Sequence, residues 1–273
     1  MATTQEAQKV ARVGNKLEGR VALVTGGTRG IGAAICRALA AQGANIAAGY
    51  SRDSEAAERL CADLGEAGIE TSTHQGNIGK ADDCRRTIAE VLDRHGRLDI
   101  LVNNAGITSD KTVSKMSDED WQKVLDVNLS GAFFLSKAAL EHMVERGTGR
   151  IINISSIIGQ TGNIGQANYA ASKSGLFGLT MTFAKEAAFA LNKAGKLEGN
   201  DVAITVNAIA PGWFPSDMSR YVLDRQDDSF SRSIPLGRFG GPDDLKCAIA
   251  YLASRAPEYV TGQVLVVDGG QSA

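Results

Sequence analysis

Tyr169 and Lys173 stand four residues apart in the segment 168–173, where a helix pattern begins. Residues at positions i and i+4 share one helix face, so a phenol and an ammonium group at this spacing can serve one site. A free phenol has a pKa of about 10, and a neighbouring cation stabilises the phenolate and lowers that pKa. Tyr169 is therefore a candidate acid or base, although an ordinary amphipathic helix with a lysine at its rim has the same spacing.

A glycine-rich turn occupies residues 25–32, which read Thr-Gly-Gly-Thr-Arg-Gly-Ile-Gly. Its glycines permit a tight turn and a close approach of a pyrophosphate, and the N-terminus of the helix that follows supplies N–H donors. The turn lies between the first predicted strand and the first predicted helix, which is the context that indicates a dinucleotide site. A turn that needs its glycines only for packing is the alternative.

The end of the second predicted strand indicates which dinucleotide is bound. An acidic side chain at this point would accept hydrogen bonds from a free ribose 2′-hydroxyl. The chain instead reads Gly-Tyr-Ser-Arg at residues 49–52, with Arg29 on the glycine-rich turn. Guanidinium groups and a hydroxyl suit a 2′-phosphate, so NADP(H) is favoured. NAD(H) stays open, because Asp53 is close by and Arg52 could pair with Asp53 or Glu55.

Strand and helix patterns alternate from Leu17 onward. Strands are predicted at 20–25, 45–49, 70–75, 98–102, 150–155, 202–209 and 263–267, and helices at 30–42, 55–66, 81–95, 118–145, 169–192 and 242–253. This alternation requires right-handed crossovers and a parallel sheet covered on both faces. We therefore expect a single α/β domain, a doubly wound parallel sheet of the Rossmann type, at 17–273 after a flexible tail at 1–16. Ligands bind beyond the carboxyl ends of such strands, where the candidate lids 108–116 and 213–239 fall.

Composition excludes several other classes. A net charge of -2 gives no global attraction to nucleic acid or to an anionic membrane, and no apolar run has the length of a membrane helix. The 4 cysteines and 3 histidines are scattered without the spacing of metal ligands. The sequence thus predicts a cytoplasmic protein without a metal, a nucleic-acid partner or a membrane partner.

Six separated motifs, taken in order, resemble the short-chain dehydrogenase/reductase family over nearly the whole chain from Leu17. They are the glycine-rich turn at 25–32, Asn-Asn-Ala-Gly at 103–106, Asn128, Ser156, the pair Tyr169 and Lys173, and Pro-Gly at 211–212. Segments 101–108 and 164–169 are similar to the 3-oxoacyl thioester reductases of that family. This resemblance implies NADPH-dependent reduction of a 3-oxoacyl thioester to the 3-hydroxyacyl thioester, with acetoacetyl-CoA slightly ahead of acyl-carrier-protein substrates.

The resemblance also implies roles for the catalytic residues. Tyr169 would donate a proton to the substrate carbonyl oxygen as hydride arrives from the nicotinamide, and Lys173 would lower the Tyr169 pKa and hold the nicotinamide ribose. Ser156 would hydrogen-bond the carbonyl oxygen, with Ser155 as the competing serine. Asn128 would anchor a water that links Lys173 to solvent.

Cofactor contacts follow from the same resemblance, in the order pyrophosphate, adenosine ribose, adenine, nicotinamide ribose and nicotinamide. The pyrophosphate would contact Gly26, Arg29, Gly30, Ile31 and Gly32, and the adenosine ribose would contact Tyr50, Ser51 and Arg52. The adenine would contact Asn77 and Ile78, and the nicotinamide ribose would contact Asn104, Ala105 and Gly106 together with Tyr169 and Lys173. The nicotinamide would contact Pro211, Gly212 and Ser216.

The substrate side is less clearly marked. Gln166 could bond a thioester carbonyl or cap local backbone, and Trp213 could line a substrate pocket or belong, with Phe214, to a lid hinge packed on the core. Residues 193–201 form a polar excursion longer than the usual turn of the family, read as a surface loop. Five cations could attract coenzyme A or an acidic carrier protein, or could be a solvated lid surface: Lys111, Lys115, Arg220, Arg225 and Arg238.

Members of the family are commonly tetramers built through two long helices, here 118–145 and 169–192, so we expect a homotetramer. Two other functions stay open at this point. One is a carbonyl or polyol dehydrogenase acting on another ketone and alcohol pair, since one fold hosts many substrates. The other is a non-catalytic NADP(H)-sensing protein, against which the filled catalytic positions argue.

Overall fold

The structure is a computed structural model that describes residues 15–197, 204–214, 231–255 and 257–273. Seven strands form one parallel sheet in the order β3-β2-β1-β4-β5-β6-β7. They are β1 (Val21–Val24), β2 (Asn45–Tyr50), β3 (Thr71–Gln75), β4 (Ile100–Asn103), β5 (Gly149–Ile154), β6 (Ile204–Pro211) and β7 (Val264–Val267). The strand order reverses between β1 and β4, which is where a doubly wound sheet opens a crevice for a ligand. The predicted fold class is confirmed.

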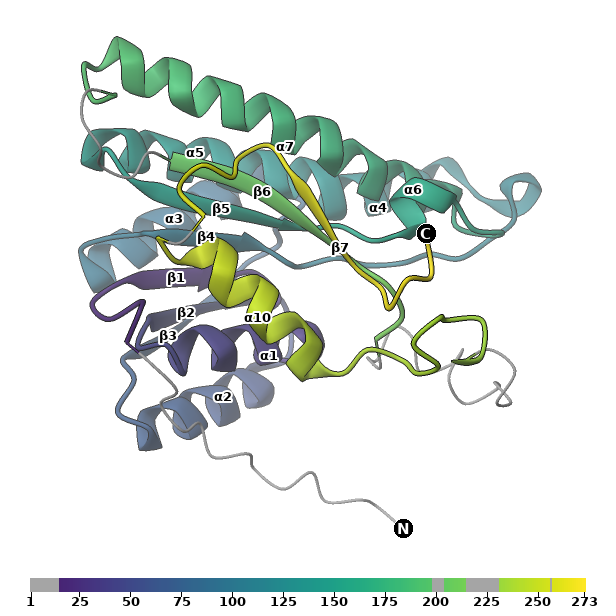
Figure 1. The fold of residues 1–273 in the computed structure, drawn as a ribbon, viewed down its shortest axis with the longest axis horizontal. Coiled ribbons are helices and arrows are strands. Elements are labelled where there is room, and N and C mark those ends of the chain that lie inside the picture. Colours follow the sequence, from purple (N-terminus) through teal and green to yellow (C-terminus); the bar gives the residue numbers. More distant parts are fainter. Residues whose placement is uncertain (1–14, 198–203, 215–230, 256) are drawn as a thin grey trace.

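Helices cover both faces of the sheet (Figure 1). One face carries α1 (Gly30–Ala40), α2 (Ser54–Glu66) and α10 (Pro242–Ala253), and the other carries α3 (Ala81–His95), α5 (Gly131–Arg146) and α7 (Ala167–Lys193). Leu39 and Ile249 are fully buried on the first face, and Leu135 and Leu191 on the second. Burying a side chain of this kind stabilises the fold by about 1.5–3 kcal/mol, so the two apolar layers hold the sheet as a rigid platform.

Local sequence sets where several helices begin and end. Asp53 accepts a hydrogen bond from the N–H of Ala56 at 2.9 Å and so caps α2. Ser117 and Asp120 form a capping box at the start of α4 (Asp118–Leu125). Gly96 ends α3 and Gly147 ends α5, each with a positive φ that a glycine adopts without strain.

The prediction of one continuous helix at 118–145 is wrong. The chain forms α4, then a π-helical turn η2 (Asp126–Ser130), then α5. The N–H of Gly131 reaches back five residues to the carbonyl of Asp126, so one extra residue is accommodated in this turn. A Cβ at Gly131 would lie 2.7 Å from the Ile78 carbonyl oxygen, so close packing requires glycine here. Two short elements were also not predicted, η1 (Val113–Lys115) and α6 (Ile158–Thr161).

The predicted start of the domain at Leu17 falls among the described residues. Leu17 is fully buried and its N–H donates to the Gln42 carbonyl at 2.9 Å. Residues 1–14 of the predicted tail and the end of the predicted surface loop lie outside the described residues. In the described part of that loop, Lys196 Nζ donates to the Val144 carbonyl at 3.2 Å and ties the end of α7 to the end of α5. Among the described helices, none combines the length and the apolar character needed to cross a membrane.

Candidate active site

The carboxyl ends of β1 and β4 are joined by hydrogen bonds between the segments that follow them. Thr25 Oγ1 accepts the N–H groups of Asn104 and Ala105, each at 3.0 Å. Asn104 Nδ2 donates to the Thr25 carbonyl at 2.9 Å. The Asn-Asn-Ala-Gly segment is therefore fixed against the glycine-rich turn, at the point where the strand order reverses.

The glycine-rich turn has the shape of a phosphate cradle. Gly26 and Gly30 have φ angles of 59° and 52°, and a Cβ at Gly32 would lie 2.0 Å from the Gly26 carbonyl oxygen. A Cβ at Gly30 would meet nothing within 4 Å, so the space in front of the turn is open. Helix α1 begins at this turn, and no side chain of the described residues caps its first N–H groups. Open space facing N–H donors fits a pyrophosphate.

Tyr169, Lys173 and Ser156 converge beyond the end of β5. Tyr169 lies in the first turn of α7, and Lys173 Nζ lies 5.6 Å from the centroid of its ring, which confirms the predicted shared face. Ser156 accepts the N–H of Ile158 at 3.2 Å and directs its hydroxyl to the Tyr169 phenol. The Ser155 hydroxyl instead donates to the Lys173 carbonyl at 2.8 Å, inside the core. Ser156 is thus the serine that faces the phenol.

The protonation of this group differs from the prediction. Burial raises the pKa of Tyr169 to about 12, the hydrogen bond from Ser156 opposes that rise, and the charge of Asp110 adds to it. The predicted lowering of the Tyr169 pKa by Lys173 is therefore wrong for the protein on its own. Lys173 Nζ donates to the Ile154 carbonyl at 2.8 Å, and burial lowers the pKa of Lys173 to about 8. The protein alone holds the phenol in its acid form.

Asn128 lies in the π-helical turn and contacts the site from there. Its Oδ1 accepts the N–H of Ile107 at 2.8 Å, and its Nδ2 donates to the Ile107 carbonyl at 3.0 Å and to Ser172 Oγ at 3.1 Å. A Cβ at Gly106 would lie 3.3 Å from Asn128 Oδ1 and 3.5 Å from Lys173 Nζ. Asn128, Gly106 and Lys173 therefore form one cluster, as the resemblance implies.

The predicted adenosine side follows β2 and β3. Tyr50 is half-buried at the end of β2, and Ser51 and Arg52 are exposed. Asp53 is occupied as the cap of α2, and Glu55 pairs with Arg59 at 3.5 Å. Neither acid neutralises Arg52.

Beyond β3, the N–H of Asn77 donates to Asp83 Oδ2 at 2.8 Å, and Asn77 Oδ1 accepts the N–H of Gly79 at 3.0 Å. Ile78 packs against the core beneath α3 and α5. These bonds fix the loop that was expected to contact the adenine.

The predicted nicotinamide side follows β6. The Pro211 carbonyl accepts the N–H of Ile157 at 3.1 Å, and the N–H of Gly212 donates to the Val267 carbonyl at 2.9 Å. Phe214 is 6% exposed, packs in the hydrophobic core and lies where a Cβ at Gly240 would overlap its ring. It also lines the cavity that Trp213 borders, so both interpretations of this pair of aromatic residues stay open.

Trp213 is half-buried and lines a cavity of about 470 Å³ with Pro235, Leu236 and other residues of the lid base. Ser216, Arg220 and Arg225 lie outside the described residues. The assignment of Trp213 to the substrate pocket stays a prediction.

Two of the five predicted cations are paired within the protein. Lys111 Nζ lies 2.5 Å from Asp120 Oδ2, and Arg238 makes a bidentate pair with Asp244 at 2.7 and 2.8 Å. Each carboxylate offsets its partner's charge, which favours the interpretation of these two cations as part of a solvated surface. Lys115 is exposed.

Gln166 bridges two loops at the entrance to the site. Its Nε2 donates to Asp110 Oδ2 at 3.0 Å, and its Oε1 accepts from Asn163 Nδ2 at 3.0 Å. Gln166 is therefore held in a local hydrogen-bond network, three residues before Tyr169. Asp110 was not predicted as a site residue; its signal in the sequence was a carboxylate inside the candidate lid 108–116.

Asn168 was also not singled out. Its Oδ1 accepts the N–H of Tyr169 at 2.7 Å, and its Nδ2 donates to the carbonyls of Ser109 and Asp120 at 3.2 and 3.1 Å. This buried amide holds the start of α7 against the segment after β4. Sequence spacing gave no signal for it, because its partners lie 48 and 59 residues away.

The described residues contain no group of three or more His, Cys, Asp or Glu side chains that could hold a metal ion. Comparison with known proteins supplies the class. The profile of the short chain dehydrogenase family matches residues 20–227, which is most of the chain. The chain belongs to the short-chain dehydrogenase family.

Two relatives within this family can be aligned with the chain over almost its full length. The 3-oxoacyl-acyl-carrier-protein reductase FabG of Staphylococcus epidermidis is 41% identical over 249 residues, which cover 91% of this chain and 97% of the relative. The 3-oxoacyl-acyl-carrier-protein reductase of Synechocystis sp. is 42% identical over 255 residues, covering 93% and 97%.

A solved structure from Agrobacterium tumefaciens, provisionally described as a gluconate dehydrogenase, has a TM-score of 0.86 and 33% identity and covers 94% of this chain and 97% of its own. As a short-chain dehydrogenase, the protein is an oxidoreductase that interconverts an alcohol and a carbonyl group and uses a nicotinamide cofactor.

Proposed function

We propose that this short-chain dehydrogenase reduces the 3-oxo group of an acyl thioester, with NADPH as the hydride donor. One observation carries the proposal: Tyr169, Ser156, Lys173 and Asn128 converge at the carboxyl edge of the sheet, in a chain 41% identical to a 3-oxoacyl-acyl-carrier-protein reductase. The product is the 3-hydroxyacyl thioester.

The cradle after β1 fits the pyrophosphate of the cofactor, since it offers open space and N–H donors. A bound nicotinamide nucleotide supplies the hydride. We assign the ends of that cofactor to the residue sets named from the sequence, with Arg29, Ser51 and Arg52 at the 2′-phosphate. The exposure of Arg52 and the engagement of Asp53 and Glu55 elsewhere support NADP(H) over NAD(H).

In this proposal Tyr169 holds the proton that the substrate oxygen receives. A phenol whose pKa is raised by burial stays protonated at neutral pH, as a general acid must. Ser156, beside the phenol, would donate a second hydrogen bond to the oxygen as charge develops on it. Lys173 and Asn128 lie behind Tyr169 and would return a proton to the phenol after each turnover.

The deciding experiment follows the absorbance of NADPH with purified protein and a panel of substrates. Acetoacetyl-CoA, longer 3-oxoacyl thioesters on coenzyme A or carrier protein, and simple ketones are compared, with NADH as the cofactor control. We expect the highest kcat/KM for a thioester with NADPH. The preferred chain length and carrier then separate acetoacetyl-CoA from carrier-protein substrates. Cofactor binding without turnover of any of them would indicate an NADP(H) sensor.

A second candidate is a dehydrogenase of polyols or sugar acids. It is favoured by the structural similarity to the Agrobacterium protein at a TM-score of 0.86. Its identity of 33% is below the 41–42% of the thioester reductases, which keeps it second. Oxidation of polyols or sugar acids by NAD(P)⁺, with no reduction of thioesters, would move the assignment to this function.

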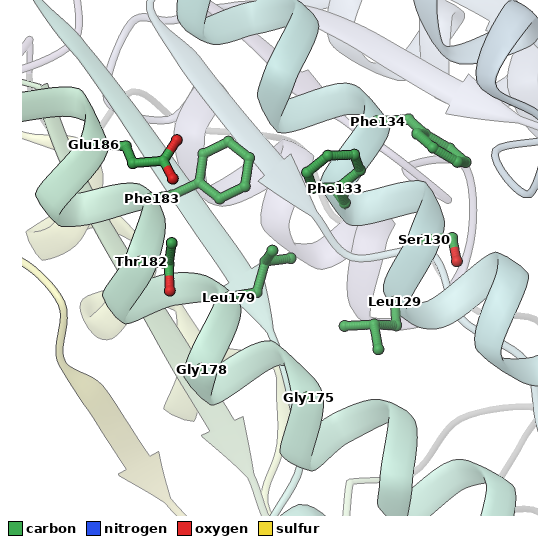
Figure 2. A pocket seen from close by; sticks show the side chains of 10 residues that line it. All are labelled: Leu129, Ser130, Phe133, Phe134, Gly175, Gly178, Leu179, Thr182, Phe183 and Glu186. Atoms are coloured by element: carbon green, nitrogen blue, oxygen red, sulfur yellow. The ribbon is translucent and has the colours of Figure 1, made fainter. Parts of the chain in front are cut away.

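We further propose that the protein is a homotetramer in which α5 and α7 pack on a second copy. A groove of about 530 Å³ runs between these helices (Figure 2), and its apolar lining includes Leu129, Phe133, Phe134, Leu179 and Phe183. Phe133 is 41% exposed and makes edge contacts with both neighbouring rings. An apolar groove with an exposed phenylalanine at its centre is typical of a protein–protein interface.

A Phe133→Glu variant should lower the mass measured by light scattering from that of a tetramer, because a charge would be buried in the contact. An Ala62→Glu variant, which adds the same charge at an exposed position of α2 on the other face of the sheet, is the control. If the wild-type protein is monomeric at working concentration, this part of the proposal is wrong. Location in the cytoplasm and the lack of nucleic-acid and membrane partners stay predictions of the sequence.

A further inference from the structure

Asp110 stands at the entrance of the site and belongs to none of the residue sets assigned above. It is exposed, and one of its oxygens accepts Gln166 Nε2 at 3.0 Å. Gln166 is the residue immediately before α7, and Tyr169 is the third residue of that helix. A carboxylate is therefore held beside the helix turn that carries the phenol.

Hydrogen bonds on both sides of Asp110 keep it there. The N–H of Lys111 donates to the Gly165 carbonyl at 2.8 Å, and the Ser109 carbonyl accepts Asn168 Nδ2 at 3.2 Å. The segment after β4 is thus pinned to the segment before Tyr169 at three consecutive positions. Because Asp110 is the middle one, these contacts hold its backbone in place, and the bond from Gln166 holds its side chain.

The other charges near this carboxylate leave it uncancelled. Lys111 pairs with Asp120 at 2.5 Å, and Lys173 lies behind the Tyr169 ring with its Nζ donated to the Ile154 carbonyl. The Gln166 amide is neutral. The charge of Asp110 is the smallest of the three causes that set the pKa of Tyr169, after burial and the hydrogen bond from Ser156, and it raises that pKa.

We propose that Asp110 is a specificity-determining residue that selects neutral 3-oxoacyl thioesters and rejects the corresponding free 3-oxo acids. The inference rests on the proposed function. In a free 3-oxo acid the carboxylate is separated by one methylene from the carbonyl that is reduced. Whenever that carbonyl oxygen sits at Tyr169 and Ser156, a second negative charge is brought to the entrance that Asp110 occupies. A thioester presents no charge at this position.

The size of the effect follows from Coulomb's law. Because Asp110 is exposed, the effective dielectric constant lies between that of a protein surface and that of water, at about 35; two like charges about 6–8 Å apart then repel by an amount that corresponds to roughly a tenfold change in an equilibrium or rate constant. Removing the Asp110 charge should therefore raise kcat/KM for a free 3-oxo acid about tenfold while changing that for the thioester much less. It should also move the high-pH fall of the reduction rate to lower pH, because the phenol then loses its proton more readily.

The test compares acetoacetyl-CoA with acetoacetate as substrates of NADPH-dependent reduction by the full-length protein. Asp110→Asn keeps the shape and can still accept the Gln166 bond, Asp110→Glu keeps the charge, and Asp118→Asn removes an exposed carboxylate that is not among the charges acting on Tyr169. Thermal melting of each variant checks that it is folded.

We expect the thioester-to-acid ratio of kcat/KM to fall about tenfold in Asp110→Asn, to recover in Asp110→Glu and to be unchanged in Asp118→Asn. Equal ratios and equal pH profiles in the wild type and Asp110→Asn would overturn the inference while leaving the proposed function standing. If the wild-type protein reduces no thioester, the proposed function itself is wrong, and this result is obtained without any of the variants.

Discussion

The glycine-rich turn and the catalytic cluster face the same crevice but are built in opposite ways. The turn is local, spanning residues 25–32, and it works through missing side chains: an added methyl at Gly32 would overlap the Gly26 carbonyl oxygen. The catalytic cluster draws Asn128, Ser156, Tyr169 and Lys173 from three elements and works through polar atoms held by hydrogen bonds. Cofactor binding is therefore vulnerable to added atoms, and the chemistry is vulnerable to the loss of one atom.

The largest effect is expected when the phenol oxygen of Tyr169 is removed from the catalytic cluster. Tyr169→Phe should lower kcat by about 10²–10⁴-fold, the usual contribution of general acid catalysis, because the phenol is the proposed proton donor. NADPH affinity, measured by fluorescence titration, should change far less, because Tyr169 is only one of many proposed cofactor contacts and the cradle is untouched. Tyr251→Phe, an exposed residue of α10, is the control. A Tyr169→Phe enzyme with near-normal turnover would contradict the proposed role.

The converse change adds one carbon to the turn. In Gly32→Ala the new Cβ would lie 2.0 Å from the Gly26 carbonyl oxygen and 2.6 Å from Asn104 Nδ2. Such overpacking should lower the free energy of unfolding by about 1–3 kcal/mol and abolish NADPH binding, measured by chemical denaturation and titration.

The matched control is Gly65→Ala in α2, where a Cβ would meet nothing within 4 Å. It should be neutral or stabilise the protein by up to about 1 kcal/mol. Equal effects at Gly32 and Gly65 would mean that the loss at Gly32 does not come from the overlap within the turn.

Lys173 allows a pH test of the catalytic cluster. Burial lowers its pKa from 10.5 in the unfolded chain to about 8 in the folded protein. Between these values the unfolded chain binds more protons, so this group makes the free energy of unfolding rise with pH across that window; below about pH 8 the full cost of burying the charge is present.

In Lys173→Met that dependence should disappear. The stability of the wild type relative to this variant should therefore increase by about 1–3 kcal/mol between pH 8 and 10.5 in denaturant titrations. The exposed Lys185→Met variant should show no such change. A flat difference across the window would mean that Lys173 is not held as a buried cation.

The smallest effect is expected at the adenosine side, where a side chain rather than the backbone is proposed to select the cofactor. Arg52→Gln should lower kcat/KM for NADPH about tenfold and leave that for NADH nearly unchanged, because one charge-assisted hydrogen bond to the 2′-phosphate is lost. Arg59→Gln on α2, whose partner is Glu55, is the control. Equal losses with both cofactors would show that Arg52 does not read the 2′-phosphate.

Features that depend on neighbours in the sequence were predicted well. The strands from β1 to β7 and helices such as α3 and α10 fall within a few residues of the predicted bounds, because hydrophobic periodicity and caps act locally. The shared face of Tyr169 and Lys173 follows from helix geometry alone and is confirmed by the 5.6 Å separation.

The errors fall where distant segments meet. The π-helical turn that aims Asn128 depends on the contact of Gly131 with Ile78, 53 positions away along the chain (131 minus 78). The predicted lowering of the Tyr169 pKa treated Lys173 as a free neighbouring cation and left out burial, which is the largest cause of the shift. The sequence suggested that Arg238 and Lys111 could attract an anionic partner, whereas the structure pairs each of them with a carboxylate.

The sequence by itself determined the doubly wound sheet, the phosphate turn and the identity of the residues that meet at its edge, since each rests on periodicity, glycine spacing or motif order. The tertiary structure alone decided the electrostatic state of the site: which cations are paired, which serine faces the phenol, and that Asp110 stands beside Tyr169. These depend on burial and on contacts across many residues, where the free energy of a charge changes with its surroundings and not with its position in the chain.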